Sequence, residues 1–219
     1  PFWNTAILAP RFIISAFVSG PAFIIIVLHL MQRLSSSVLP TLLIPDGPIR
    51  TLARFLRITV IANIFLALAE VFTHAYTGGH HGLASEYLFL GLHGANGLVP
   101  WIWTALVLNT GAAIILLFGG KQGPKESRRL LLIACVMVFC GVWIEKGMGL
   151  IVPGFIPSTL GEVVEYTPSL VEWKINAGIW AFGFGLLTIA LRVTAAIFND
   201  AKLVEGKIET VKDEPEDGE

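Results

Sequence analysis

Long apolar runs alternate with short polar segments along the whole chain. Five of these runs approach or exceed the ~20 residues that an α-helix needs to cross the hydrocarbon core of a bilayer. We expect them to form helices at about 3–30, 55–76, 100–118, 130–151 and 171–198. An open sheet would leave unpaired backbone groups in lipid, so the predicted fold class is an all-α integral membrane protein with a bundle of about five transmembrane helices.

The composition agrees with this prediction. Hydrophobic residues make up 54% of the sequence and charged residues 14%, and the mean hydropathy is +0.73. A soluble domain of this length does not need so much apolar surface. Only the last segment is polar and acidic, so we expect a helical bundle over 1–199 and an acidic tail over 200–219 that extends as a mobile arm.

The basic residues are sorted by loop, which predicts how the chain crosses the membrane. Lys and Arg follow the first, third and fifth predicted helices, whereas the loops at 77–99 and 152–170 contain neither. Loops rich in Lys and Arg stay on the cytoplasmic side. We therefore expect a multi-pass protein of the cytoplasmic membrane, with its N-terminal end outside and its tail in the cytoplasm.

Ionisable side chains within apolar runs cost ~2.5–3.5 kcal/mol each on insertion scales and are therefore candidates for function. On the second predicted helix, Asn63, Ala67, Glu70 and His74 follow a spacing of four, three and four, which places them on one face. A buried carboxylate can carry a proton, and a His one turn away can receive it. Asn63, Glu70 and His74 are proton-transfer candidates; the alternative is a static ion pair of Glu70 with a basic residue on a neighbouring helix.

Two adjacent charges, Glu145 and Lys146, stand inside the fourth apolar run. The ~22 Å of helix that precedes them is shorter than the ~30 Å hydrocarbon core, so Glu145 should lie just inside the outer boundary. Adjacent side chains point ~100° apart around a helix. We therefore expect the two to face different partners and not to form one salt bridge, with Glu145 a further proton-transfer candidate and Lys146 an anchor or counter-charge.

Other polar side chains fall at the same predicted depth. Arg11 lies one or two turns into the first helix, and Lys174 and Asn176 lie at the outer end of the fifth. Charges of both signs at one level predict a buried ion-pair network in which Arg11, Lys146, Lys174 and Asn176 join the acidic candidates. The alternative for the basic side chains is that they snorkel to the interface and need no function.

The last outer loop is acidic and contains several Pro and Gly residues. We expect it to form a docking surface for an extrinsic subunit, with Glu162, Glu165 and Tyr166 as the candidate residues. The other outer loop contains three His residues beside Gly, but their spacing fits no zinc pattern. No metal site is therefore predicted, and this loop is expected to be a polar surface segment.

The sequence offers no redox cofactor site. A haem b held between helices needs two His residues at one height, whereas His29 and His74 are predicted at opposite ends of their helices. The chain has no Cys cluster for iron–sulfur and no nucleotide-binding loop. We expect this chain to bind no haem or iron–sulfur group, to have no catalytic residue of its own, and to contact lipid but no nucleic acid.

Two stretches resemble a known family. "WNTAILAPRFIISAFVSGPAFIIIVL" resembles the helix that opens the C-terminal half of the NrfD-type family, the membrane subunits of polysulfide reductase and related anaerobic respiratory complexes. "IEKGMGLIVPGFIPSTLGEVVEYTPSLVEW" is similar to the DsrP and HmeC branch, found in membrane complexes of sulfate reducers. The resemblance covers essentially the whole chain and implies that it is the C-terminal half of a larger subunit with two helix bundles.

The resemblance implies a role in quinol-linked electron transport. Such a subunit exchanges electrons between menaquinol and an extracytoplasmic iron–sulfur subunit, beside a multihaem cytochrome c and other membrane and cytoplasmic subunits, and conducts protons. In this branch the complex serves dissimilatory sulfate or sulfite reduction. The family's proton carriers map here onto Glu70, His74 and Glu145.

Some points of function stay open in the sequence. The family's quinone pocket lies mainly in the first bundle, so Arg11 and His74 are the candidates that remain for quinone binding in this chain. One alternative is a di-haem cytochrome b-type subunit of a five-helix quinol oxidase. Another is a transporter or assembly protein that uses the same buried charges.

Overall fold

The computed structural model describes residues 6–38, 46–77, 80–92, 94–119, 124–155 and 168–212. In these residues the regular structure is helical apart from one isolated bridge between Leu92 and Ala95. Five helices are long and apolar enough to cross a membrane, which confirms the predicted fold class of an all-α, multi-pass membrane protein. The chain falls into two compact units, Pro1–Ser36 with Ile44–Glu165, and Ser37–Leu43 with Tyr166–Glu219.

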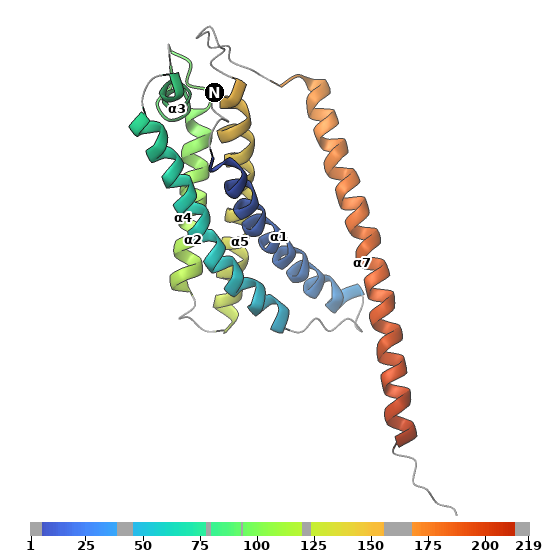
Figure 1. Ribbon diagram of the computed structural model, residues 1–219. Coiled ribbons are helices and arrows are strands. Elements are labelled where there is room, and N and C mark those ends of the chain that lie inside the picture. Colours follow the sequence, from blue (N-terminus) through green and yellow to red (C-terminus); the bar gives the residue numbers. More distant parts are fainter. Residues whose placement is uncertain are drawn as a thin grey trace, which may run out of the picture. The chain divides into compact units, whose positions relative to one another are not determined.

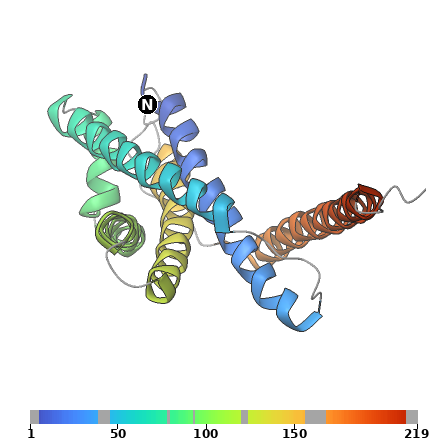
Figure 2. The same ribbon diagram turned by 90° about the horizontal axis from the view of Figure 1, so that it is seen from below.

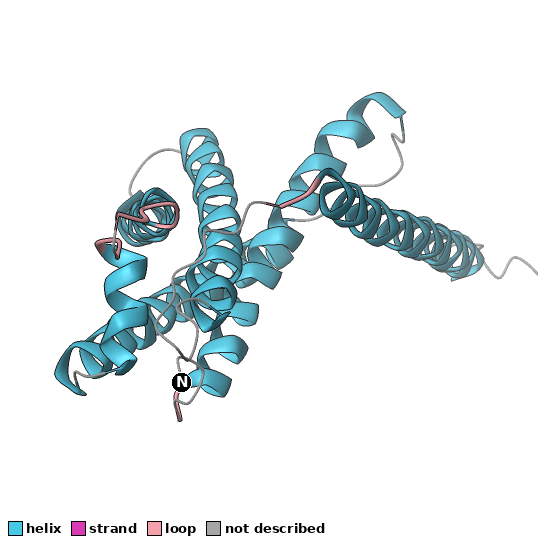
Figure 3. Ribbon diagram, turned by 90° about the horizontal axis from the view of Figure 1, so that it is seen from above, coloured by secondary structure: helices cyan, strands magenta, loops and turns pink. Residues whose placement is uncertain are grey.

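The first unit is built on four long helices. They are α1 (Leu8–Val38), α2 (Asp46–Thr77), α4 (Val99–Phe118) and α5 (Pro124–Lys146). Consecutive members of this set run in opposite directions, as the colours in Figure 1 show. The view from below in Figure 2 shows α4 nearly end-on, with α1 and α2 inclined to it, and the view from above in Figure 3 shows that the described residues are almost entirely helical.

Small and branched apolar side chains fill the centre of this unit. The core consists of Val18, Ala22, Ile25, Ala53, Leu56, Val60, Ala112, Ala113, Leu116, Ala134, Cys135, Val138 and Val142. Large apolar side chains such as Phe65 and Phe72 point outwards and are each 68% exposed, as lipid-facing residues are. Glycine lets α4 and α5 approach closely, since a Cβ on Gly141 of α5 would lie 3.2 Å from Leu108 Cβ on α4.

A short helix covers one end of the first unit. α3 (His80–Phe89) lies near one end of α4 (Figure 1) and contacts α2, α4 and the short helix α6 (Val152–Phe155). Trp103 Nε1 on α4 donates a hydrogen bond of 3.2 Å to Phe89 O. A second apolar cluster forms here from Ala84, Tyr87, Leu88, Leu98, Ile102 and Leu150. The prediction of a polar surface loop is therefore wrong for this segment: its apolar residues are too few to span a membrane but sufficient to pack a helix.

The fourth span continues past its two adjacent charges. After Lys146 the chain forms a π-helix, η2 (Gly147–Ile151), and then one α-helical turn, α6 (Val152–Phe155). Single turns of π-helix are rare and occur often at functional sites. A Cβ on Gly149 would lie 2.9 Å from Ile102 Cδ1, so this glycine lets η2 pack against α4.

The second unit is dominated by α7 (Leu170–Lys212), a helix of 43 residues. Ser169 N donates to Glu172 Oε2 at 2.6 Å, and Glu172 N donates back to Ser169 Oγ at 3.4 Å. This reciprocal capping box fixes where the helix begins. We expected a helix end near residue 198 and a mobile arm beyond it. The helix itself continues to Lys212, through a stretch in which three Lys and two Glu residues favour helix.

Candidate functional site

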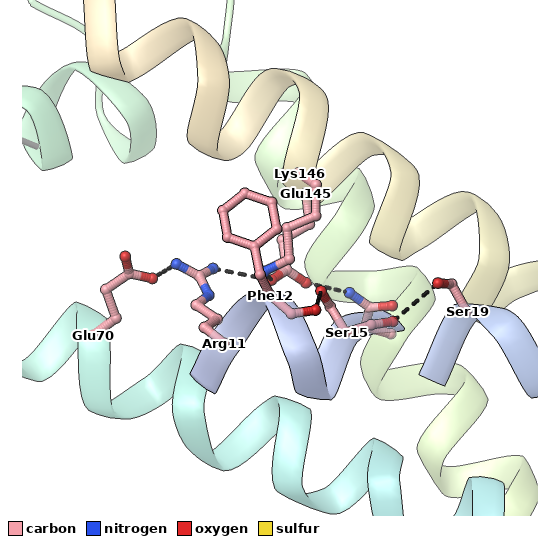
Figure 4. Close-up of polar contacts among 8 residues, drawn as sticks. Arg11, Phe12, Ser15, Ser19, Glu70, Glu145 and Lys146 are labelled. Atoms are coloured by element: carbon pink, nitrogen blue, oxygen red, sulfur yellow. Dashed lines mark hydrogen bonds and ion pairs between the residues drawn. The ribbon is translucent and has the colours of Figure 1, made fainter. Parts of the chain in front are cut away.

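Four charged side chains from three helices meet inside the first unit (Figure 4). They are Arg11 on α1, Glu70 on α2, and Glu145 and Lys146 on α5, and their side chains are only 6–13% exposed. We call this group the charge cluster. Two positive and two negative groups make it formally neutral, which is the arrangement that a buried set of charges requires.

Arg11 is the bridge of the charge cluster. Its Nη1 forms an ion pair with Glu70 Oε2, and its Nη2 donates to Glu145 Oε1 at 2.9 Å. A guanidinium presents its N–H donors in a fixed planar fork, so one Arg can hold two carboxylates in two directions. Arg11 therefore ties α1 to both α2 and α5.

Glu145 accepts hydrogen bonds from three side chains. Its Oε1 receives Arg11 Nη2 at 2.9 Å and Lys146 Nζ at 3.1 Å, while its Oε2 receives Asn109 Nδ2 at 2.8 Å. A buried carboxylate is stable only where such partners replace its lost hydration. Glu145 is thus the point at which α1, α4 and α5 are joined.

The contact between Lys146 and Glu145 corrects a prediction, because these neighbours were expected to face different partners. The flexible four-carbon stem of Lys146 bridges the ~100° offset between adjacent positions, so its ammonium group curls back onto Glu145. The same Nζ lies 5.7 Å from the ring centroid of Phe12 on α1, within the range of a cation–π contact. Glu145 and Lys146 therefore both face α1.

Asn109 is a member of the site that was not predicted from the sequence. It lies in the middle of α4, is 7% exposed, and is the donor to Glu145 Oε2. Its amide lies against Gly141 of α5, where a Cβ would come within 2.9 Å of Asn109 Cγ. The available signal was an amide side chain in an otherwise apolar span, and the same rule that selected Asn63 would have selected it.

Below the charge cluster, buried polar side chains continue along α1 and α2. Ser15 Oγ donates to Phe12 O at 2.8 Å, and Thr59 Oγ1 donates to carbonyl groups of its own helix at 3.2 Å. Asn63 is 1% exposed, and its Oδ1 has no hydrogen-bond partner in the described part of the chain. It lies two helical turns, ~10.5 Å along the axis, from Glu70.

The other residues predicted from the sequence either lie away from the charge cluster or fall outside the described part of the structure. His74 belongs to α2, one turn after Glu70, but its side chain is outside the described part of the structure. Lys174 and Asn176 lie on α7, in the other unit, so their place in the ion-pair network stays a prediction. The docking residues Glu162, Glu165 and Tyr166 lie outside the described residues.

The chemistry of this site is that of protons and charge. In the described ranges no three His, Cys, Asp or Glu residues are grouped so that they could hold a metal ion. A neutral cluster with two carboxylates acquires a net charge when it gains or loses one proton. In a poorly hydrated interior the dielectric constant is low, so this new charge interacts strongly with neighbouring groups. The arrangement can therefore couple proton occupancy to helix contacts or to a nearby charged reactant.

Comparison with known proteins agrees with the resemblance of the two stretches. The family described as "Polysulphide reductase, NrfD" matches residues 1–156, which include the whole charge cluster. A Halobacterium salinarum protein whose name describes a membrane subunit of dimethyl sulfoxide reductase is 25% identical over 215 residues. That alignment covers 87% of this chain and 46% of the relative, so the chain spans about half the length of the curated relative that it matches.

No solved structure matches the chain. The family match covers more than two thirds of the sequence and contains α1 to α5, while α7 lies beyond it. The five apolar helices and the buried charges are consistent with that match. The chain therefore belongs to the NrfD family.

Proposed function

We propose that this protein is the membrane subunit of an anaerobic respiratory complex that exchanges electrons between menaquinol or menaquinone and partner subunits on the outer side of the membrane. Membership of the NrfD family supports this proposal. The name of the Halobacterium salinarum relative, which refers to a membrane subunit of a reductase, supports it further. In this proposal the redox groups are carried by partner subunits and by the quinone, and not by this chain.

The charge cluster is the observation that carries the proposal. Arg11, Glu70 and Glu145 are nearly buried within predicted membrane spans. Placing such charges in a membrane costs free energy, and an apolar set of similar volume would hold the helices together equally well or better. Their presence favours a role in moving protons or in stabilising charge on a reactant. Quinol oxidation releases two protons with its two electrons, so a proton pathway belongs to this reaction class.

The residues take the following proposed roles. Glu70, His74, Glu145 and Asn63 transfer protons, with Arg11 and Lys146 balancing the acidic charge. Arg11 and His74 are also the candidates for contact with the quinone, whose site would lie mainly in a part of the protein beyond this chain. Lys174 and Asn176 belong to the same proposal as further members of the ion-pair network.

The proposed assembly follows from the loop charges and the resemblance of residues 144–173. The N-terminal end of the chain lies outside the cytoplasmic membrane, and the C-terminal end lies in the cytoplasm. The outer loop with Glu162, Glu165 and Tyr166 docks an extracytoplasmic iron–sulfur subunit, with a multihaem cytochrome c in the same complex. Further membrane and cytoplasmic subunits complete the assembly, and its physiological role is dissimilatory sulfate or sulfite reduction, as in the DsrP and HmeC branch.

The test uses the intact complex in native membranes. Addition of a menaquinol analogue should reduce the haem and iron–sulfur groups of the partner subunits, and Glu145→Gln should slow this reduction per assembled complex. No quinol-dependent reduction in a fully assembled complex would contradict the proposal. A stoichiometric amount of haem b in the isolated full-length subunit would instead favour a cytochrome b-type subunit.

A further inference from the structure

Asn109 is the contribution of α4 to a site otherwise made of charged residues. Its Nδ2 donates to Glu145 Oε2 at 2.8 Å, on the opposite carboxylate oxygen from the one that receives Arg11 and Lys146. Asn109 Oδ1 is buried and accepts no hydrogen bond from any described residue. The amide therefore interacts with the cluster through one N–H group directed at one oxygen atom.

Gly141 makes room for this amide. A Cβ at position 141 would lie 2.9 Å from Asn109 Cγ and 3.2 Å from Leu108 Cβ, and it would come closer still to Asn109 Oδ1. Real Cβ atoms essentially never approach another heavy atom as closely as 2.9 Å, so any larger residue would displace the amide. The absence of a side chain at Gly141 thus leaves the space that the Asn109 amide occupies.

A carboxylate needs such a partner if its orientation matters. The terminal torsion of a Glu side chain has a broad, roughly two-fold energy profile, so packing of the aliphatic part leaves the two oxygens free to rotate. Arg11 and Lys146 both bind one oxygen and do not fix the direction of the other. The hydrogen bond from Asn109 to the second oxygen does fix it.

We propose that Asn109, seated on Gly141, is a positioning residue that orients the Glu145 carboxylate by donating to its Oε2. The inference rests on the proposed function only in taking Glu145 as a proton-carrying group. Asn109 thereby holds Oε2 towards α4 and leaves Oε1 directed at the two cations, Arg11 and Lys146. Whether Asn109 forms this hydrogen bond to Glu145 can be tested without any measurement of quinol oxidation.

The decisive variant is Asn109→Asp, which keeps the shape of the side chain but has no N–H group. The introduced carboxyl group can donate to Glu145 only while it holds a proton, because two ionised carboxylates would otherwise face each other at hydrogen-bond distance. The charged groups around it are Glu145 and Lys146 on α5, Arg11 on α1 and, through Arg11, Glu70 on α2. Folding of this variant therefore requires a bound proton that the unfolded chain releases, so its stability should fall as the pH rises.

The measurement is the temperature at which the subunit aggregates in the detergent-solubilised intact complex, followed from about pH 6 to about pH 8.5. We expect the midpoint of Asn109→Asp to fall relative to wild type as the pH rises. Adding Glu145→Gln should remove this pH dependence, because the introduced Gln amide donates to the ionised carboxylate of the Asn109→Asp side chain. A midpoint that follows wild type at every pH, or a pH dependence that survives Glu145→Gln, would overturn the proposal.

Gly141 provides a second test that needs no new charge. Gly141→Ala should lower the midpoint in the wild-type background and lower it clearly less in an Asn109→Ala background, where the clashing amide is gone and only the 3.2 Å contact with Leu108 Cβ remains. Gly111→Ala is the matched control on the facing helix, since its Cβ would meet only the flexible end of Met137. Equal losses in both backgrounds would show that Gly141 does not act through Asn109. None of these measurements involves electron transfer, so a negative result is separate from failure of the proposed function.

Discussion

Arg11 Nη2 lies 2.9 Å from Glu145 Oε1, although 134 positions separate the two residues in the sequence. The contact joins the first long helix to the fourth, and the ion pair of the same guanidinium with Glu70 adds the second. A single side chain thus fixes the relative positions of three membrane spans. The stability of the first unit should depend on it more than on any one apolar residue.

Replacement of Arg11 by Leu should destabilise the protein strongly. It leaves Glu70 and Glu145 buried without their shared cation, and loss of one partner of a buried ion pair costs about 3–5 kcal/mol. The amount of subunit in the membrane and its aggregation temperature in the solubilised complex would show the loss. Arg57→Leu is the control, because Arg57 is exposed on α2. Equal effects of the two variants would contradict the bridging role of Arg11.

Replacement of Glu145 by Gln should affect turnover more than assembly. Gln keeps an oxygen that can accept from Arg11, but it cannot carry a proton, so menaquinol-dependent turnover should fall by roughly 10²-fold. Turnover is measured per assembled complex, and Glu86→Gln serves as the exposed control on α3. Normal turnover in an assembled Glu145→Gln complex would contradict proton transfer by Glu145 and leave it with a structural role in the charge cluster only.

Replacement of Lys146 by Met should have a milder effect than loss of Arg11. Lys146 binds one carboxylate oxygen at 3.1 Å and keeps its ammonium group over Phe12, whereas Arg11 binds two carboxylates. We expect a loss of about 1.5–3 kcal/mol of folding free energy, in the range of one charge-assisted hydrogen bond. The same aggregation temperature measures it, and a loss as large as that of Arg11→Leu would contradict this ranking.

In the turn after α3, substitution of Gly91 by Ala should be more disruptive than substitution of Gly94. Gly91 and Gly94 both adopt positive φ, at 84° and 86°, a conformation that costs an L-residue about 1 kcal/mol. A Cβ at Gly91 would also collide with Asn96 and lie 3.0 Å from Ala95 O, whereas one at Gly94 would meet nothing within 4 Å. Gly91→Ala should therefore increase proteolysis at this turn more than Gly94→Ala does. The reverse order would show that the collision with Asn96 is relieved without cost.

The membrane spans and the four members of the charge cluster could be predicted from the sequence for the same physical reason, although the contact between Lys146 and Glu145 could not. A bilayer requires long apolar helices, so the runs that form α1, α2, α4, α5 and α7 are recognisable from composition alone. Charged residues are so unfavourable there that Arg11, Glu70 and Glu145 stand out. Their meeting in space follows from the antiparallel order of the helices, which places them at a common depth.

Other features depended on contacts that a single sequence does not reveal. Lys146 turns back onto Glu145 because its long stem is flexible, which helix geometry at Cα does not indicate. Asn109 could be noticed as an amide in an apolar span, but its contacts with Glu145 and with Gly141 on another helix could not be predicted. The helix α3 is stabilised by packing against α4 and η2, since its ten residues are too few to be stable alone.

During synthesis Arg11 is made well before its two carboxylate partners, Glu70 and Glu145. Ribosomes add about 5–20 residues per second, so the 134 residues between Arg11 and Glu145 take roughly 7–27 s to make. Throughout that interval the first helix carries a cation whose final set of partners does not yet exist. Until α5 is made, Arg11 has at most one of its two carboxylate partners, Glu70, so α1 is least compatible with lipid during that interval.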